Sequence, residues 1–530
     1  MPAERDPGES AAIALARPFG DFAELVRGHA RQRPAHAAIV QGERSLSYGE
    51  LDGRMDRIAA TLHANGGGPR RALAICAAAS IEHVTVFLAA LRAGMAPAPI
   101  SPALRPADIA AMAIDSGAPF LFVDRAADEA LGACVTPPRI RLDAGSFERW
   151  FAPYAPRPGS PGIAPDWPFN IIYSSGTTGE PKGIVQPHAM RWAHLQRGAA
   201  YGYGPDCVTL VSTPLYSNTT LVALLPTFAL GGTAVLMEKF EPRAFLALAE
   251  RHRATHAMLV PVQYRRIMAL DDFARFDLSS FRMKFSTSAP FAAGLKRDVL
   301  ARWPGGLVEY YGMTEGGGTC VLVAHQHPGK LHTVGQPAPG HDIRVIGEDG
   351  RELARGETGE VVGRSSAMMT GYHNRPGKTA EAEWHDAEGR RFIRTGDVGR
   401  FDEDGFLVLV DRRKDLVISG GFNVYPSDLE AVVAVHPAVA EVAVVGVPSA
   451  QWGETPVAFA VAKPGTAVDG AMLLAWANAR LGKVQRLAAV EIVPALPRSS
   501  IGKVLKRELR AAYLARAGDP GKSGRSNALQ

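Results

Sequence analysis

Hydrophobic residues in the first part of the chain recur with a helical period and then in short continuous runs. The segments Phe22–Ala30 and Tyr48–Ala64 have the helical period and flank a short polar hairpin region. The apolar segments Ala72–Cys76, Ile81–Ala93 and Met95–Ile100 then predict a strand, a helix and a further strand. Strands that alternate with helices in this way are typical of parallel sheets with helices packed on them.

The alternation continues through Thr255–Val260 and Met283–Ser286 and changes after about residue 331. From there to about residue 410, short alternating strands such as Asp342–Ile346 and Phe406–Val410 are separated by Gly and Asp turns. This pattern predicts a small β-barrel or sheet beside the stacked α/β layers.

The chain after about Asp415 predicts a compact α+β unit. Its expected elements are helix Ser427–Val435, strands Glu441–Val447 and Val457–Val461, helix Ala471–Leu481, strand Ala489–Val493 and helix Val504–Ala515. We therefore predict an α/β protein with a large N-terminal domain of several subdomains (residues 1–413) and a small C-terminal domain (residues 414–517). The polar, Gly- and Ser-rich tail (residues 518–530) is expected to be disordered.

Composition narrows the class of protein. The 530 residues are 46% hydrophobic and 21% charged, with a net charge of +5, and the basic residues are scattered among acidic ones, which disfavours a nucleic-acid partner. The four cysteines form no CxxC pair, which favours a reducing cytoplasmic location over a disulfide framework. The charged start is unlike a secretory signal. Pro and Gly residues interrupt the uncharged stretch Cys207–Met237, so no membrane segment is predicted.

The strongest local motif is a turn rich in Gly and hydroxyl residues directly after the extended run Phe169–Tyr173. It contains Ser175, Gly176, Thr177, Thr178, Gly179 and Lys182. Glycines let backbone N–H groups approach an anion, and a lysine supplies positive charge for a polyphosphate. Gly183 follows the lysine, so the motif is not a Walker A loop. A flexible linker is the alternative, but linkers rarely follow a buried strand directly.

With this loop, the chain resembles the adenylate-forming superfamily of acyl-CoA synthetases, luciferases and peptide-synthetase adenylation domains. The resemblance runs from about Phe22 to Leu509, and several motifs follow in the family's order. In the segment Tyr310–Glu315 it implies that Tyr311 stacks on adenine, Thr314 meets the α-phosphate and Glu315 binds Mg²⁺, which prefers oxygen ligands.

The resemblance assigns further nucleotide contacts. Ser288 and Ala289 lie in a segment similar to the family's adenine loop, although Thr287 and Ser288 stand where Gly and Ala are common. It also implies that Asp397 binds the ribose hydroxyls and that Arg412 faces ribose and phosphate.

The resemblance also implies that the small C-terminal domain is mobile and that it contributes residues to the reaction. It implies that Lys414 is the hinge and that Lys503 bridges the attacking carboxylate and the α-phosphate, where a preorganised cation offsets the repulsion of two anions. The loop that contains Lys503 resembles sites that are acetylated in related synthetases, and acetylation would remove the positive charge of this lysine. The segment expected to line a coenzyme A tunnel comprises Gly420, Gly421 and Phe422, with Trp452 in a second motif of the CoA-ligase branch. Gln485 stands where relatives have Pro.

The acid pocket is expected around Tyr216 and Ser217 and around Gly316 and Gly317. No Asp lies nearby to pair with an α-amine, which disfavours an amino acid. The glycine run suggests room for an elongated or bulky acid: fatty, alicyclic or aromatic. The histidines at 325, 327 and 332 lack supporting ligands, so a metal site there is disfavoured.

These residues together predict an AMP-forming acid–CoA ligase that uses ATP, Mg²⁺ and CoA. A stand-alone adenylating enzyme that loads a carrier-protein phosphopantetheine, a luciferase-like oxygenase and a non-catalytic nucleotide-binding protein are the alternatives. The sequence leaves the acid and the oligomeric state open.

Overall fold

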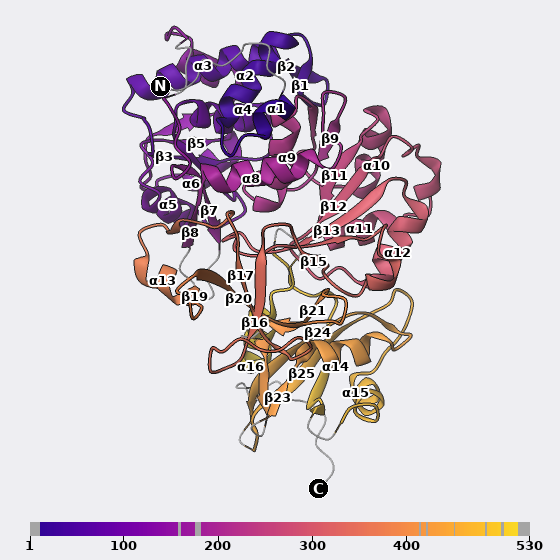
Figure 1. Ribbon diagram of the computed structural model, residues 1–530. Coiled ribbons are helices and arrows are strands. Elements are labelled where there is room, and N and C mark those ends of the chain that lie inside the picture. Colours follow the sequence, from indigo (N-terminus) through magenta and orange to yellow (C-terminus); the bar gives the residue numbers. More distant parts are fainter. Residues whose placement is uncertain are drawn as a thin grey trace. The chain divides into compact units, whose positions relative to one another are not determined.

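The computed structural model describes residues 11–156, 161–174, 182–412, 415–419, 422–449, 451–482, 485–499 and 503–517 (Figure 1). These residues form two compact units. The first takes the described residues up to Ile343 together with Val362–Arg394, and the second takes Arg344–Val361 and the described residues from Thr395 onward. The chain therefore passes from one unit to the other inside strands rather than through a single linker. The domain boundary expected between residues 413 and 414 remains a prediction.

A nine-stranded sheet dominates the first unit, in the order β15-β14-β13-β12-β11-β9-β10-β1-β2. Its central strands are parallel, and antiparallel pairs close both edges. The strands are β1 (Ala37–Gln41), β2 (Arg44–Ser47), β9 (Val208–Val211), β10 (Thr233–Leu236), β11 (His256–Leu259), β12 (Met283–Ser286), β13 (Gly306–Tyr311), β14 (Cys320–Val323) and β15 (Gln336–Pro337). The predicted antiparallel hairpin before residue 48 is β1 and β2.

A second, parallel sheet has the order β4-β3-β5-β6, and a small antiparallel sheet has the order β18-β8-β7. The strands are β3 (Ala72–Cys76), β4 (Ala96–Ile100), β5 (Leu121–Val123), β6 (Arg139–Arg141), β7 (Pro168–Ser174), β8 (Lys182–Pro187) and β18 (Gly371–Tyr372). Every residue of β3 and β4 is buried, which explains their continuous apolar sequences.

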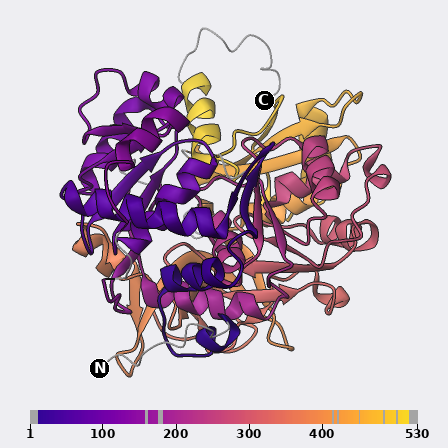
Figure 2. The same ribbon diagram turned by 90° about the horizontal axis from the view of Figure 1, so that it is seen from above.

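Helices and short 3₁₀ turns connect these strands. They are α1 (Ala11–Leu15), α2 (Phe22–Gln32), α3 (Tyr48–Ala64), α4 (Ile81–Arg92), α5 (Pro106–Asp115), α6 (Arg125–Leu131), α7 (Ala144–Phe151), α8 (His188–Ala199), α9 (Asn218–Ala229), α10 (Pro242–Arg251), α11 (Pro261–Met268), η1 (Phe273–Arg275), α12 (Ala293–Arg302), η2 (Pro328–Lys330) and α13 (Pro376–Glu381). In Figures 1 and 2 the indigo helices α1 and α2 lie beside the magenta helices α8 and α9, with which they pack. The N-terminal segment therefore supports helix α8, which lies beside the candidate site.

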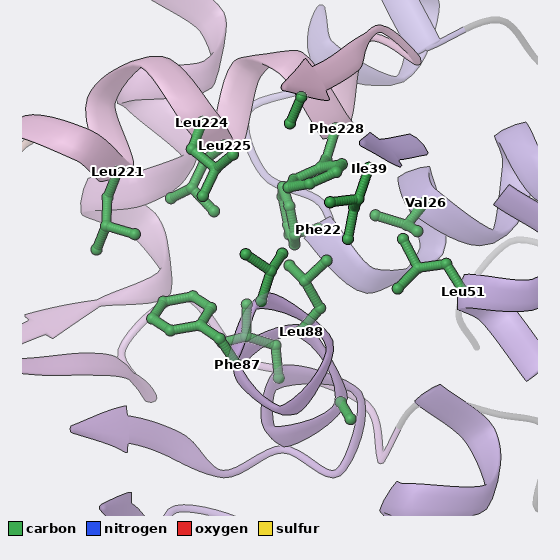
Figure 3. Close-up of a cluster of buried hydrophobic side chains, with 14 of the residues drawn as sticks. Phe22, Val26, Ile39, Leu51, Phe87, Leu88, Leu221, Leu224, Leu225 and Phe228 are labelled. Atoms are coloured by element: carbon green, nitrogen blue, oxygen red, sulfur yellow. The ribbon is translucent and has the colours of Figure 1, made fainter. Parts of the chain in front are cut away.

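The hydrophobic core of the first unit joins helices that are far apart in the sequence. In Figure 3, Phe22 of α2, Phe87 of α4 and Phe228 of α9 belong to one buried cluster, and each is at most 4% exposed. All residues of α4 are buried, so this helix packs on every side. The predicted apolar helix Ile81–Ala93 is α4, and the uncharged stretch Cys207–Met237 contains the buried helix α9.

Three strands carry the chain from one unit to the other. They belong to a five-stranded sheet in the order β16-β17-β20-β19, with β21 paired to β20. The strands are β16 (Asp342–Ile346), β17 (Gly359–Arg364), β19 (Glu383–His385), β20 (Arg391–Phe401) and β21 (Leu407–Arg412). The predicted small β-barrel or sheet of this region is thus a sheet.

The second unit contains another five-stranded sheet, in the order β23-β22-β25-β24 with β26 paired to β25. Its elements are β22 (Val417–Ser419), β23 (Phe422–Val424), α14 (Pro426–Ala434), β24 (Val439–Ser449), β25 (Gly453–Ala462), α15 (Gly470–Asn478), β26 (Ala489–Ile492) and α16 (Lys506–Ala517). Each predicted helix and strand of this unit is present with shifted ends, and the fold class predicted from the sequence is confirmed.

Two further observations concern the predicted context. Within the described ranges, no helix is both long and apolar enough to cross a membrane. The four cysteines are free thiols, three of them buried. The predicted disordered tail (residues 518–530) lies outside the described residues.

Candidate active site

The predicted phosphate loop lies between two paired strands. Strands β7 and β8 are antiparallel, and their last described pair joins Ser174 to Lys182. Ser175, Gly176, Thr177, Thr178 and Gly179 lie between these ends, outside the described residues. Lys182 is the first residue of β8 and is partly buried. Its backbone position is therefore fixed by the sheet.

Strand β18 brings a tyrosine to the predicted phosphate lysine. Tyr372 pairs with Ile184 of β8, and Nζ of Lys182 lies 5.1 Å from the centroid of the Tyr372 ring. The Tyr372 hydroxyl donates a 2.8 Å hydrogen bond to Oε1 of Glu315. Burial, followed by the charge of Glu315, raises the pKa of Tyr372, so the hydroxyl keeps its proton. Tyr372 thus connects Lys182 with Glu315, two residues that sequence reasoning proposed separately.

Glu315 has the arrangement that a hard cation requires. Its Oε1 accepts from Tyr372, while Oε2 has no hydrogen-bond partner among the described residues, and the side chain is partly exposed. A carboxylate with one oriented oxygen and one available oxygen fits Mg²⁺, which takes oxygen ligands and retains water. In the described part of the chain, no group of three or more His, Cys, Asp or Glu side chains is placed to hold a metal ion.

A buried amide network fixes Thr314. Gln186 of β8 is fully buried, and its Nε2 donates a 2.6 Å hydrogen bond to the carbonyl oxygen of Thr314. The side-chain oxygen of Gln186 accepts from Nδ2 of Asn170, at 2.9 Å, and from the guanidinium of Arg191. A buried amide with its groups satisfied holds one geometry, because moving it would leave polar atoms unpaired. Sequence reasoning missed Gln186 and Tyr372, since only strand pairing places them beside residues 314 and 315.

The predicted adenine loop is joined to the predicted acid pocket. Ser288 adopts a φ of +79°, and its hydroxyl lies 2.6 Å from Oγ1 of Thr219 in α9. A positive φ is unstrained for Gly and strained for Ser, so Ser288, one of the two departures noted in the sequence, has an unusual backbone conformation. Ala289 follows directly. The hydrogen bond between Ser288 and Thr219, which lies near the start of α9, stabilises this strained conformation.

Ser217 has a structural role at the start of α9. Its side chain is 8% exposed and accepts a hydrogen bond from the backbone N–H of Thr219, which caps the helix. Tyr216, directly before it, is partly exposed. The cap holds both residues in place near the adenine loop.

The glycine run after Glu315 is required by close packing. Gly316 and Gly317 have φ values of +76° and +83°, and a Cβ added at Gly316 would lie 2.1 Å from the carbonyl oxygen of Ala367. At Gly317 it would lie 2.7 Å from the carbonyl oxygen of Gly363. The run was expected to leave room for a bulky acid, but backbone already fills the space on the Cβ side of both glycines.

Tyr311 is the last residue of β13 and pairs with Cys320 of β14. It is partly exposed, whereas the preceding Tyr310 stacks on the buried Phe285 with ring centroids 5.8 Å apart. Successive residues of a strand point to opposite faces, so the two tyrosines serve different surroundings.

The second unit places two predicted ribose contacts opposite each other. Asp397 of β20 pairs with Arg412 of β21. The backbone N–H of Asp397 donates to Oγ1 of Thr395 at 3.0 Å, which fixes the turn around Gly396. The Arg412 side chain and the predicted hinge Lys414 lie outside the described residues.

The loop of the predicted catalytic lysine is closed by its own backbone. The carbonyl oxygen of Lys503 accepts from the N–H of Ser499 at 2.8 Å, and the N–H of Lys503 donates to Oγ of Ser499 at 3.2 Å. Leu505 N–H donates to the carbonyl of Pro497, also at 2.8 Å. Lys503 is partly buried and directly precedes the segment that leads into α16.

Strand pairing brings together the two segments predicted to contact coenzyme A. Ser419 pairs with both Phe422 of β23 and Gly453 of β25. Trp452, directly before Gly453, is 50% exposed, an unusual state for a large aromatic side chain. Gly420 and Gly421, and the side chain of Phe422, lie outside the described residues.

Comparison with known proteins supports a single family. A profile described as "AMP-binding enzyme" matches residues 26–373, and one described as "AMP-binding enzyme C-terminal domain" matches residues 428–503. The feruloyl-CoA synthase of Amycolatopsis sp is 33% identical over 91% of this chain and 97% of that protein. The fatty acid–(acyl-carrier-protein) ligase ScoC of Streptomyces coeruleorubidus is 32% identical over 92% of this chain and 95% of that protein. The crystal structure of ATP-bound MatB from Rhodopseudomonas palustris has a TM-score of 0.81 at 30% identity, covering 93% of this chain and 99% of that one.

Proposed function

Because the chain belongs to the family of AMP-binding, adenylate-forming enzymes, we propose that it is an AMP-forming acid–CoA ligase. In the first step the carboxylate of an acid attacks the α-phosphate of ATP, which gives an acyl-adenylate and pyrophosphate. In the second step the thiol of coenzyme A attacks the acyl carbon, which gives the thioester and AMP. The acid is a fatty, alicyclic or aromatic acid.

The connection of Lys182 to Glu315 through Tyr372 is the observation that carries this proposal. It joins a cation and a carboxylate from distant parts of the sequence to one tyrosine, and the cation follows the loop of residues 175–179 in the sequence. In the proposed roles, Lys182 and the loop bind the ATP phosphates, and Thr314 contacts the α-phosphate. Glu315 would hold Mg²⁺, which supplies neutralisation of phosphate charge when bound.

The remaining contacts follow the same scheme. Tyr311, Ser288 and Ala289 receive the adenine, while Asp397 and Arg412 bind the ribose. Tyr216, Ser217, Gly316 and Gly317 border the acid. Each of these positions is a proposal that rests on the family motif.

Lys503 is proposed to supply positive charge where the two anions meet during adenylation. The small domain (residues 414–517) would then turn about Lys414 and bring Gly420, Gly421 and Phe422, with Trp452, to the thiol. The pairing of Ser419 with Phe422 and Gly453 supports a shared role for these segments.

The test is release of AMP and pyrophosphate across fatty, alicyclic and aromatic acids, with and without CoA. Release of AMP that requires CoA supports the ligase. Pyrophosphate release without CoA dependence would instead favour a carrier-protein acceptor, as in the name of ScoC. Turnover with none of the acids, despite ATP binding, would favour a non-catalytic nucleotide-binding protein.

The Lys503→Ala variant separates the two steps. It should lose adenylation and retain thioester formation from supplied acyl-adenylate, because the lysine is proposed to act only on the first step. Equal loss in both half-reactions would show that the proposed role is wrong.

A further inference from the structure

Two residues of helix α8 and a histidine that directly precedes β16 form a cluster of hydrogen-bond donors in the first unit. We call it the α8 donor cluster, and it consists of His194, Arg197 and His341. The hydroxyl groups of Tyr310 and Tyr201 form a hydrogen bond with each other and interact electrostatically with Arg197. All five residues are partly exposed.

Two donors of the cluster face each other. The backbone N–H of Thr319 donates to Nδ1 of His341 at 3.0 Å, so a neutral His341 carries its proton on Nε2. That Nε2 lies 3.3 Å from Nη2 of Arg197, whose nitrogens are donors only. Two N–H groups cannot satisfy each other, so each needs an acceptor, which would lie beside the pair.

His194 adds a third donor. Nη1 of Arg191 lies 3.4 Å from Nδ1 of His194, so the arginine donates and the proton of a neutral His194 is on Nε2. That Nε2 has no partner in the described ranges. Burial lowers the pKa of both histidines, with the positive charge of Arg197 acting in the same direction, so both rings are neutral near pH 7.

The charge of Arg197 also lacks a counter-ion. No carboxylate of the described chain forms an ion pair with it. By contrast, the buried Arg92 of the same unit pairs with both Asp52 and Asp56. A largely buried guanidinium is stabilised when an anion neutralises it, and a guanidinium matches the geometry of a carboxylate. Arg197 therefore has the surroundings of a ligand-binding residue rather than those of a structural one.

Helix α8 connects this cluster to the proposed acid pocket. The methyl group of Met190 would lie 3.0 Å from a Cβ added at Gly316, at the start of the glycine run. Arg197 is seven residues farther along the same helix, or about 10 Å at the α-helical rise. Thr319, which orients His341, follows the glycine run directly. Helix α8 and Thr319 thus link the cluster to the glycine run that the proposed function assigns to the acid pocket.

We propose that the α8 donor cluster binds a second carboxylate of the acid substrate, so that the enzyme activates one end of a dicarboxylic acid. This inference rests on the proposed function and names its substrate class. Three donors and one uncompensated positive charge suit a carboxylate better than a neutral hydroxyl, which would itself need an acceptor for its proton. A hydrocarbon end would leave the donors unpaired.

The test compares matched acids that differ only at the far end. One series is octanedioic, omega-hydroxyoctanoic and octanoic acid, and the other is para-carboxycinnamic, para-hydroxycinnamic and cinnamic acid. Acid-dependent release of pyrophosphate gives kcat/KM, and ligand-induced thermal stabilisation measures binding without turnover. The variants are Arg197→Gln and His341→Gln, with Arg243→Gln as a control because Arg243 is exposed and pairs with Asp272 elsewhere in the unit.

The dicarboxylic member of at least one series should be the best substrate. Arg197→Gln should lower its kcat/KM by about 10- to 100-fold, the loss expected for a hydrogen bond to a charged group, while the monocarboxylic acid changes little. His341→Gln should have a smaller effect in the same direction, and Arg243→Gln should have none.

Several outcomes would overturn the inference. It would be overturned if the monocarboxylic or hydroxy acids were turned over and bound better than the dicarboxylic acid in both series. It would also be overturned if Arg197→Gln lowered kcat/KM equally for all acids, because that would indicate a structural role for Arg197. If no acid is turned over but a dicarboxylic acid still binds through Arg197, the subsite stands and the proposed ligase function fails. If no dicarboxylic acid binds or reacts while another acid supports CoA-dependent AMP release, the ligase function stands and the subsite fails.

Discussion

The hydroxyl of Tyr372 offers a direct test of how Glu315 is oriented. In Tyr372→Phe the ring beside Lys182 remains, and only the 2.8 Å hydrogen bond to Oε1 of Glu315 is lost. A hydrogen bond to a charged group contributes about 1.5–3 kcal/mol, and the lower end applies here because both side chains are partly exposed. About 1.5 kcal/mol corresponds to roughly a tenfold loss in the rate of adenylation.

The assay is ATP–pyrophosphate exchange at a series of Mg²⁺ concentrations. We expect a rate lower by about tenfold and a higher Mg²⁺ concentration for half-maximal exchange, because the carboxylate would no longer be held in one orientation. Transfer from supplied acyl-adenylate to CoA should be unchanged. Tyr154→Phe is the control, because it also removes a hydroxyl that takes part in one hydrogen bond, which Tyr154 accepts from Nδ2 of the exposed Asn65.

The reasoning would be refuted by an unchanged Mg²⁺ dependence together with an unchanged exchange rate. It would also be refuted by equal losses in both half-reactions. A lower melting temperature with normal exchange would show that the hydrogen bond supports the fold and not the chemistry.

Three further predictions concern stability, each measured by chemical denaturation. Gln186→Leu should lower the free energy of unfolding by about 3 kcal/mol, because it leaves buried polar partners unsatisfied; a loss below about 1 kcal/mol would contradict this. Gly316→Ala should be destabilising by more than about 3 kcal/mol, since its Cβ would overlap a carbonyl oxygen, whereas Gly42→Ala, with a φ of +59° and open space, should lose only about 1 kcal/mol. Burial lowers the pKa of His83 from 6.5 to about 4, so the unfolded chain takes up its proton first, and stability should fall as pH drops from 6.5 toward 4. His83→Gln should weaken this dependence, and an identical pH profile would show that other groups cause it.

The sequence by itself determined the elements and their class. The apolar run of β3 and the helical period of α3 appear in the structure with the predicted bounds, and the strands of the second unit appear with ends shifted by a few residues. These features can be predicted locally, because the hydrophobic period of a helix or strand is visible in the consecutive residues that form it. The loop of residues 175–179, Glu315, Asp397 and Lys503 were also predicted from local motifs, and their roles remain proposals.

Only the tertiary structure decided which of these residues meet. The pairing of β8 with β18 places Tyr372 beside Lys182, and the buried Gln186 reaches the carbonyl of Thr314. No local pattern marks either residue, because each acts through a partner more than a hundred positions away. The glycine run after Glu315 shows the same limit: composition suggested open space, whereas the structure fills that space with the backbone of residues 363–367. The donors around Arg197 likewise come from separate segments of the chain, and they form a cluster only because the fold brings those segments together.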